Sequence, residues 1–585
     1  MPIQTVVCGG GLNTEALITD MKPGEALALL NVEVDVSGSY TTMAGIEPFD
    51  GRLEPNKANY KILKLASVTG ITLGAVITAT SGWTARVVGI DGNEVAVIDP
   101  NGPLTLADSV EGNAIQALPI DAEASTYELH KQTRKYAEGY YRSLIQAVPG
   151  MGPVRGIVIY KGAIYAFRDH TDFATCRMYK ASASGWVLIP TSGFLLKDGT
   201  YGFSIHNFNA GAGTKKLVIV NGVNKACIYD GTTVSQISTG MTVDKPSSVE
   251  VLPSSVLLLG FDNGSLMTSG PGTPTDFTVG SGGAEIGMSD KIIGLALQPD
   301  ERVAVFCEQS IRILTGKTIA TYATSIFNDE AGAVRGSIGN IGDSIFLSQS
   351  GLTRLSRTQT YGSFEMTGLD QKVKSLIVNS DVLFSVVVRN KNQYRLFYSG
   401  GFLGFTMSGQ DVIGSFTGKY PTKMACGYSA EIANEEYVLL GGEDGFVYRA
   451  DVGTSHAGES YSRLARLAHN DLRSPQQRKK FKRLTINADS QRYEPISVAV
   501  TLDYSSPDAL RQSPADIFVG GAESYYGTAI FGESVFGSAD DAINQIYLSG
   551  VGRSLSVTML INSDTCTPVR FGGYSIEYMN RAKTR

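Results

Sequence analysis

Short runs of alternating or continuous apolar residues, separated by Gly, Asn and Asp, cover most of the chain between Val154 and Val452. Alternation of apolar and polar residues is typical of half-buried β-strands, and the small polar residues between the runs are typical of tight turns. Segments such as VRGIVIYKGAIYAFRDH and VLFSVVVRNKNQYRLFYSG each contain a pair of such runs. The pattern predicts an array of short antiparallel strands.

The strand pattern repeats about every 40 to 50 residues, with about three or four strands in each unit. The units open near Val154, Phe203, Val249, Ile292, Val334, Val382 and Met424. This period is typical of β-propeller blades, whose closure into a ring protects the strand edges. We therefore expect an all-β chain with a propeller of roughly six or seven blades at residues 151–455. Two unrelated β-sandwiches with evenly spaced strands are the alternative, since no WD, kelch or Asp-box signature marks the repeat.

Three regions precede the propeller. Residues 1–60 are expected to supply strands that join the propeller or a sandwich. Residues 61–120 contain alternating runs on both sides of Asp91-Gly92-Asn93, a hairpin signal that predicts a small inserted β module. Residues 121–150 are predicted to form a linking helix.

The helix prediction depends on a stripe of residues at three- and four-residue steps, which is typical of a helix face. The stripe consists of Leu129, Thr133, Tyr136, Tyr140 and Leu144. We expect this face to pack into a core, and a groove for a partner is the alternative.

Residues 456–585 are predicted to form a C-terminal β-sandwich, with the boundary near residues 453–458. The expected strands are Arg483–Ala488, Ile496–Leu502, Gln545–Leu548, Ser554–Ile561 and Tyr574–Met579.

Composition agrees with a folded, turn-rich protein of several domains. The chain has 585 residues, of which 43% are hydrophobic and 18% charged, with 66 Gly and 27 Tyr. A chain of this length is too long to fold around a single hydrophobic core, so several domains are expected. A net charge of −6 gives no overall basic footprint for binding DNA through its phosphates. The longest apolar runs, such as residues 256–259, are too short for a membrane-spanning helix.

Few residues are suited to catalysis or metal binding. Gly316-Lys317-Thr318 resembles the end of a phosphate-binding loop, but Ile311 stands where the loop needs its first glycine, so a blade turn is the simpler interpretation. The five histidines and six scattered cysteines show no metal-ligand spacing, and we expect reduced thiols, no metal and no cofactor. The histidines are His130, His170, His206, His456 and His469, and the cysteines are Cys8, Cys176, Cys227, Cys307, Cys426 and Cys566.

Three pairs of adjacent carboxylates are the remaining catalytic candidates. Glu435-Glu436, Glu443-Asp444 and Asp540-Asp541 supply the residue type that glycosidases use. Adjacent residues of a strand point to opposite faces, however, so such a pair does not converge on one bond. We therefore expect solvated charges and no enzyme activity.

One basic segment departs from the acidic average of the chain. In YSRLARLAHNDLRSPQQRKKFKR, basic residues are opposed only by Asp471. A solvated linker is one interpretation, and a docking surface for an acidic partner, with Phe481 as its apolar centre, is the other. The candidate interface comprises Arg473, Arg478, Lys479, Lys480, Phe481, Lys482 and Arg483, with Arg463 and Arg466 upstream.

Several segments resemble structural proteins of bacteriophage tails. The opening stretch has an Asn-x-Glu-Val-Asp turn followed by a strand of the Gly-Ile-Glu-x-Phe-Asp-Gly type. These motif residues are Asn31, Glu33, Val34, Asp35, Gly45, Glu47, Phe49, Asp50 and Gly51. Further segments are similar to parts of the same proteins. They are the module around SGWTA, the junction AEGYYRSLIQAVPGMGPVRGIVIYKGAIYAFRD, the paired segments DKIIGLALQPDERVAVFCEQSIRILTG and GSIGNIGDSIFLSQSGLTRLS, and the ending VGRSLSVTMLINSDTCTPVRFGGYSIEYMNRAKTR.

The resemblance implies a hub or nozzle of the lower tail tube in short-tailed phages. Such a protein is a virion component, assembled in the host cytoplasm as a homo-hexameric ring around the DNA exit channel. Its expected partners are copies of itself, tail adaptor and portal proteins, and tail fibres, while DNA passes through the lumen without specific binding. A receptor-binding tail fibre or a propeller glycan hydrolase is the alternative function.

Overall fold

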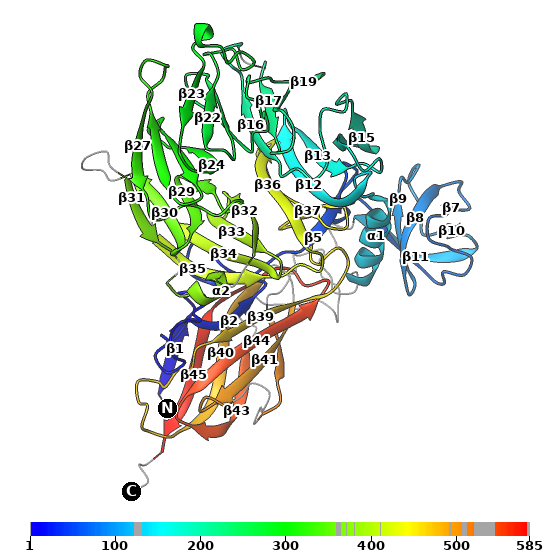
Figure 1. Cartoon of the computed structure of the whole chain (residues 1–585). Helices are drawn as coiled ribbons and strands as arrows, with labels where there is room; N and C mark the ends of the chain where they lie inside the picture. Colours follow the sequence, from blue (N-terminus) through cyan, green and yellow to red (C-terminus); the bar gives the residue numbers. More distant parts are fainter. Residues whose placement is uncertain are drawn as a thin grey trace. The chain divides into compact units, whose positions relative to one another are not determined.

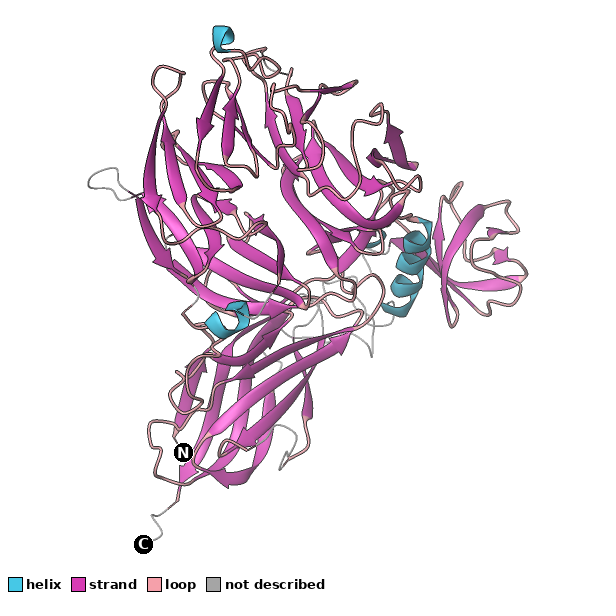
Figure 2. Cartoon of the chain, viewed as in Figure 1, coloured by secondary structure: helices cyan, strands magenta, loops and turns pink. Residues whose placement is uncertain are grey.

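In the computed structural model nearly all the regular secondary structure is β, with 52% of residues in strands and 5% in helices (Figure 2). It describes residues 2–121, 131–211, 213–357, 364–369, 371–378, 381–409, 411–490, 494–505, 512–519 and 544–581. The predicted all-β class with a propeller is confirmed.

The chain divides into two compact units. The first unit comprises residues 1–11, 17–146 and 449–585, and the second comprises residues 12–16 and 147–448. The chain therefore passes between the units at four points, and its two ends belong to the same unit.

The second unit is a β-propeller, in which each blade is an antiparallel meander (Figure 1). The first blade contains β12 (Met151–Tyr160), β13 (Ala163–Asp169), β14 (Cys176–Ser182) and β15 (Gly185–Ile189). The second contains β16 (Gly202–His206), β17 (Lys216–Val220), β18 (Cys227–Tyr229) and β19 (Val234–Gln236). The third contains β20 (Ser248–Val251), β21 (Leu257–Gly260), β22 (Ser265–Thr268) and β23 (Ala284–Gly287), preceded by the short helix η3 (Val279–Ser281).

The remaining blades follow the same order. The fourth contains β24 (Ile292–Leu297), β25 (Val303–Cys307), β26 (Ile311–Thr315) and β27 (Ala323–Asn328). The fifth contains β28 (Gly339–Ile341), β29 (Asp343–Ser348), β30 (Gly351–Arg357) and β31 (Phe364–Gly368), followed by helix α2 (Lys374–Val378). The sixth contains β32 (Val382–Val388), β33 (Gln393–Tyr398), β34 (Gly401–Ser408) and β35 (Asp411–Gly418), and the seventh contains β36 (Met424–Ile432), β37 (Glu435–Gly442) and β38 (Val447–Ala450).

The first strands β12, β16, β20 and β24 contact one another in turn, as do β28, β32 and β36, and β36 lies against β12, which closes the ring. At the closure, the Cys426 thiol donates to the carbonyl of Val154 at 3.3 Å. Gly156 on β12 allows the next blade to pack closely, because a Cβ at this position would lie 2.7 Å from Cβ of Tyr201. In the residues that the structure describes, the ring has seven blades, the upper number of the prediction.

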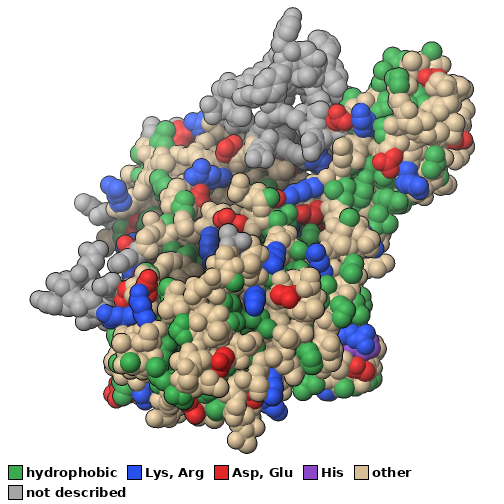
Figure 3. Space-filling view, turned by 90° about the horizontal axis from the view of Figure 1, so that it is seen from above, with side chains coloured by type: hydrophobic (Ala, Val, Ile, Leu, Met, Phe, Trp, Pro, Cys, Tyr) green, Lys and Arg blue, Asp and Glu red, His purple; other side chains and the backbone are tan. Residues whose placement is uncertain are grey.

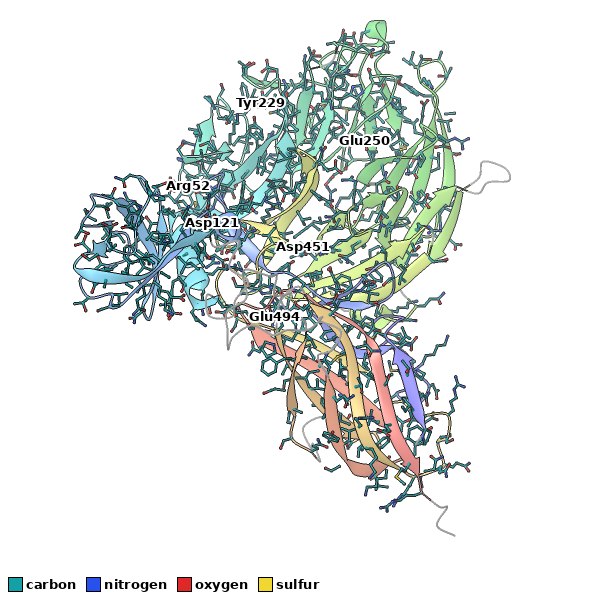
Figure 4. All side chains as sticks on the ribbon, turned by 180° about the vertical axis from the view of Figure 1, so that it is seen from behind. Arg52, Asp121, Tyr229, Glu250, Asp451 and Glu494 are labelled. Atoms are coloured by element: carbon teal, nitrogen blue, oxygen red, sulfur yellow. The ribbon has the colours of Figure 1, made fainter. Side chains whose placement is uncertain are left out.

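Between blades, apolar side chains form continuous cores. Phe167 and Met178 of the first blade pack with Leu217 and Ile219 of the second. Three tyrosines extend this core, with ring centroids 5.7 to 6.1 Å apart, and Tyr229 among them is labelled in Figure 4. They are Tyr160, Tyr165 and Tyr229.

The first unit contains the small β module. Its strands are β6 (Lys61–Leu65), β7 (Val76–Thr78), β8 (Thr84–Asp91), β9 (Glu94–Ile98), β10 (Ser109–Val110) and β11 (Asn113–Asp121). They pair in the order β10-β11-β6-β9-β8-β7, and a bridge between Ala79 and Val110 joins the two ends of the sheet into a small barrel. The hairpin expected at Asp91-Gly92-Asn93 connects β8 and β9, and Gly92 has a φ of 53°.

Helix α1 (Lys131–Leu144) follows the module. Its buried residues on the module side are Thr133, Ala137 and Tyr141, which recur every four residues and pack on β8 and β9. The predicted stripe is correct only in part: Thr133 is buried and Tyr140 is partly buried against the same core, whereas Tyr136 and Leu144 are 48% and 44% exposed. The small residue Ala137 lies closest to the sheet, where a Cβ at Gly89 would be 2.9 Å from its nitrogen. Leu129, the first residue of the predicted stripe, lies outside the described residues.

Both ends of the chain form the sandwich. One sheet has the order β3-β4-β45-β40-β43, with β1 pairing β45, and β2-β39-β44-β41-β42 form the other layer. The N-terminal strands are β1 (Ile3–Val7), β2 (Ala26–Leu30), β3 (Val32–Val34) and β4 (Tyr40–Thr42). The C-terminal strands are β39 (Tyr461–Leu467), β40 (Lys479–Ser490), β41 (Glu494–Leu502), β42 (Ala515–Val519), β43 (Gln545–Gly552), β44 (Leu555–Ser563) and β45 (Val569–Asn580).

Strand β5 (Ile46–Phe49) and the short helix η1 (Pro55–Lys57) follow the N-terminal strands of the sandwich. The predicted C-terminal strands each overlap an observed one. The sandwich differs from a purely C-terminal domain because residues 3–42 supply four of its strands.

Candidate functional site at helix α1 and the basic segment

The basic segment predicted from the sequence belongs to the sandwich. Arg463 and Arg466 lie on β39, Arg473 and Arg478 lie in the following loop, and residues 479–483 begin β40. Successive residues of β40 point to opposite faces of its sheet, so the basic residues do not share one surface.

Phe481 and Lys479 both point into the sandwich and are fully buried. Phe481 lines a small cavity together with Val500, Leu502 and Leu548. The hypothesis that Phe481 forms the apolar centre of an exposed interface is therefore not supported by its position, because strand alternation places it in the core.

Lys479 is held by backbone carbonyls. Its ammonium donates to the carbonyls of Ser474 at 2.7 Å, Gln477 at 3.2 Å and Arg553 at 2.9 Å. Burial lowers its pKa. Three acceptors match the three donors of an ammonium, so Lys479 fastens the loop before β40 to the turn before β44.

Arg463 is also buried and structural. Its guanidinium donates to the carbonyls of Thr454 at 2.8 Å and Cys566 at 3.2 Å, and lies 3.9 Å from the ring centroid of Tyr461. The His456 ring stacks on the Tyr461 ring, with centroids 3.6 Å apart. Burial lowers the pKa of His456 to about 3. The arginine thus joins three segments of the first unit.

The exposed part of the candidate interface is smaller than predicted. Arg473, Arg478 and Lys480 are exposed and Lys482 is half-buried. Arg483 is half-buried and pairs with Glu577 at 3.0 Å. The remaining candidate surface therefore comprises Arg473, Arg478, Lys480 and Lys482, which we call the exposed basic set.

Helix α1 contributes a second charged cluster, which the sequence analysis missed. On the side away from the module, Lys131 binds Glu494 of β41 at 3.0 Å, and Lys135 binds Asp564. Glu494 is labelled in Figure 4. The four-residue spacing of Lys131 and Lys135 on a helix was a visible signal, but their acidic partners lie over 350 residues away in the sequence.

Arg142 extends this cluster through a partly buried bidentate ion pair. Its Nε and Nη2 donate to Glu47 at 2.7 Å each. Burial opposes the charge on Arg142, but the hydrogen bonds and charge of Glu47 raise its pKa. Burial raises the pKa of Glu47, and Arg142 opposes that shift. Planar two-point contacts of this kind fix orientation as well as distance.

Asp50 lies near the end of the same helix. It accepts hydrogen bonds from the backbone nitrogens of Arg52 and Gln146 at 3.0 Å each. Nearby, the buried Glu54 binds the buried Arg449 at 2.5 and 2.6 Å. Glu47 and Asp50 belong to the motif that resembles phage tail proteins, so two of its polar residues hold the segment 142–146.

A cavity of about 300 Å³ lies beside α1. Its charged and polar lining includes Lys131, Arg134, Lys135, Glu138 and Thr567. Lys131 and Lys135 are both bound to carboxylates, so their charges are balanced. We therefore interpret this cavity as a polar gap in the packing and not as a strongly cationic site.

The other sequence candidates occupy turns and strands. Gly316-Lys317-Thr318 forms the turn between β26 and β27, where the nitrogens of Lys317 and Thr318 donate to the hydroxyl of Thr321. Lys317 also pairs with Glu301 at 2.5 Å. These interactions match the interpretation as a blade turn.

The carboxylate pairs are engaged locally. Glu436 accepts from the backbone nitrogens of Arg389 at 2.8 Å and Asn390 at 2.9 Å. Asp444 lies in the turn between β37 and β38 and accepts from Tyr448 at 2.6 Å. Asp540-Asp541 lies outside the described residues.

The six cysteines are free, and burial raises the pKa of Cys307 to about 11. Within the described ranges, no group of three His, Cys, Asp or Glu side chains is placed to hold a metal ion. Among the helices of the described part, none is both long and apolar enough to cross a membrane. On the face shown in Figure 3, basic and acidic side chains are interspersed.

No protein-family model matches this chain, and no curated protein sequence matches it significantly. Virginiamycin B lyase from Staphylococcus aureus is a similar solved structure, with 12% identity over 52% of this chain and 98% of that chain and a TM-score of 0.38. YCF48 is similar with 13% identity over 52% of this chain and 95% of that chain and a TM-score of 0.34. The blade count and ring closure given above come from the strand order of this chain itself.

Proposed function

We propose that this chain is a non-catalytic structural subunit of a short-tailed phage tail. In this proposal it is a nozzle or hub protein that forms a closed ring around the DNA exit channel. The proposal begins from the resemblance of the N-terminal, module, blade and C-terminal segments to tail proteins.

The observation that carries the proposal is the use of the motif residues Glu47 and Asp50. Both carboxylates are fully buried and bind Arg142 and the backbone of Gln146, at the end of the helix that precedes the propeller. Two residues that support the resemblance therefore bind the segment 142–146 at the end of helix α1. The two-point contact between Arg142 and Glu47 fixes orientation as well as distance, and so supports one arrangement of the elements that it joins.

The chain connectivity supports the same role. The chain passes between the two units four times, and strands from both its N-terminal and C-terminal segments pair in one sandwich.

A closed ring of identical subunits avoids open-ended growth, and about six copies are expected from the resemblance. The exposed basic set is a candidate contact for an acidic surface of a neighbouring copy or adaptor, since the whole chain carries a net charge of −6. DNA would pass through the lumen without specific binding.

The test is immunogold labelling of purified virions with antibodies against this chain. Label at the distal end of the tail axis supports the nozzle proposal. Label on peripheral fibres would favour the receptor-binding alternative, and release of reducing sugar from host polysaccharide by the purified protein would favour the hydrolase alternative.

A further inference from the structure

One sheet of the sandwich has an outer face that carries exposed apolar and basic side chains together. Strands β1, β45, β40 and β43 lie side by side in this sheet (Figure 1). On its inner face, Phe481, Leu484 and Ile576 are buried in the core of the sandwich. The residues that alternate with these three along the strands point away from the core. We call the surface that they form the outer sheet face.

The strand registers align the side chains of the outer sheet face in rows. Ile3 of β1 lies opposite Glu577 of β45. Arg483 of β40 lies opposite both Glu577 and Tyr547 of β43. Since neighbouring strands are about 4.8 Å apart, this row of four side chains spans about 14 Å.

A second row runs beside the first. Lys480 of β40 lies opposite both Met579 of β45 and Val551 of β43. The register shifts between Phe481 and Arg483, so Lys482 is the extra residue of a β-bulge. Lys480 is exposed and Lys482 is half-buried. The bulge explains why Lys480 and Arg483 share one face although they are three residues apart.

Three large apolar side chains are exposed on this face. Tyr547 is 77% exposed, Ile3 is 65% exposed and Met579 is 44% exposed. Scattered single apolar residues are normal on a protein surface, whereas a group on one face indicates an interaction site. Tyr and Met are also enriched in protein interfaces. Tyr547, and not the buried Phe481, is therefore the aromatic residue that this part of the sandwich offers to a partner.

The outer sheet face also has uncompensated positive charge. Glu577 binds Arg483 at 3.0 Å. Among the residues that the structure describes, no carboxylate forms an ion pair with Lys480 or Lys482. Residues 461–483 carry eight basic side chains and one acidic side chain, so the rest of the chain has a net charge of −13 within the total of −6. Every other copy of the chain thus carries an excess of acidic groups that complements this face.

We infer that the outer sheet face binds a different, acidic surface of a second copy of this chain, with Tyr547 at the centre of the contact. Contact between the same face of two copies would bring four lysines together, and like charges across an interface are unfavourable. The contact is therefore heterologous, and heterologous contacts between identical subunits form rings when the rotation between neighbours closes. The choice of a second copy as the partner rests on the proposed ring of identical subunits.

The first experiment is sedimentation of the purified full-length chain over a range of concentrations. The wild type should form oligomers. Tyr547→Ser should weaken the association at least about tenfold, because an aromatic residue at the centre of an interface commonly contributes this much. Lys480→Gln/Lys482→Gln should also weaken it, with a larger effect at low salt. The matched control is Phe173→Ser, which replaces a 66% exposed aromatic residue between β13 and β14 and should leave association unchanged.

The second experiment maps the partner surface by photo-cross-linking. The variant Tyr547→p-benzoylphenylalanine should link two copies of the chain, and mass spectrometry should place the linked peptide in an acidic segment outside β1, β40, β43 and β45. A link between the outer sheet faces of two copies would contradict the heterologous contact.

Two further results would overturn the inference. One is a wild-type chain that stays monomeric at every concentration and gives no cross-linked dimer, and the other is unchanged association of a Tyr547→Ser variant whose thermal unfolding matches the wild type. Neither result would contradict the nozzle proposal, because a ring that closes through another face would still be labelled on the tail axis. Label away from the axis, with copies still linked through Tyr547, would contradict the nozzle proposal and support this contact.

Discussion

Lys479 and Lys480 are neighbours in the sequence and have opposite environments. Lys479 is fully buried and donates to three carbonyls, whereas Lys480 is exposed on the other face of β40. The charges of both residues were predictable from the sequence. Which of the two is buried was not predictable, because it depends on the exact start and phase of the strand.

The pair gives a matched test of the buried ammonium. Lys479→Met keeps the apolar stem and leaves the carbonyls of Ser474, Gln477 and Arg553 without this donor. We expect a loss of about 1–3 kcal/mol in the free energy of unfolding, measured by urea denaturation. Lys480→Met should change it by less than about 0.5 kcal/mol. Equal effects of the two substitutions would show that the carbonyl contacts do not stabilise the sandwich.

His469 makes the stability of the sandwich depend on pH. Burial lowers its pKa from 6.5 to about 4, with a further lowering by Arg466 and an opposing effect of Asp503. Because the unfolded state binds the proton more tightly, stability is complete above about pH 6.5 and is lost as the pH falls towards about 4. The expected loss from this group is about 1–3 kcal/mol.

The measurement is the urea midpoint of the wild type and of His469→Gln between about pH 7.5 and about pH 4.5. The variant should lose less stability on acidification, because it lacks this titrating group, while His456 titrates equally in both proteins. Parallel pH profiles would contradict the account.

At the scale of elements, the repeat was predictable where each blade begins with a long apolar strand. Val154, Ile292 and Val382 lie on the first strands β12, β24 and β32. Val334 instead precedes β28, a first strand of only three residues. A strand this short has little periodicity of its own, and its position depends on contacts with neighbouring blades.

The ion pairs of α1 were not predictable from local pattern. Their partners Glu47, Glu494 and Asp564 come from distant segments that only the folded first unit brings together. The same lack of long-range information explains why Ala137 and Tyr141 were missing from the predicted buried face of the helix. The backbone nitrogen of Ala137 lies 2.9 Å from the place of a Cβ at Gly89, so the missing side chain at Gly89 allows the helix to approach the sheet.

Close packing between blades gives a test at Gly156. A Cβ there would lie 2.7 Å from Tyr201, so Gly156→Ala should destabilise the propeller by about 1–3 kcal/mol. Gly287→Ala on β23 is the matched control, because its Cβ would meet no atom within 4 Å. Alanine in a strand without a clash is neutral or favourable, so a similar response at both positions in thermal unfolding would contradict the packing argument.

For the whole molecule, the exposed basic set is proposed to contact an acidic surface during assembly. Replacing Arg478, Lys480 and Lys482 by Gln should leave the subunit folded and reduce its incorporation into tails, with a larger effect at low salt. Lys479 is kept in this variant because it is part of the core. Incorporation is measured by the amount of variant chain in purified particles, and normal incorporation at both low and moderate salt would remove this surface from the proposed interface.

The most direct test of the central claim is a cryo-electron microscopy reconstruction of the phage tail that contains this chain. The account predicts a closed ring of about six copies on the tail axis, with an open lumen along the DNA path. A reconstruction that places the chain in single or peripheral copies, away from the axis, would contradict it.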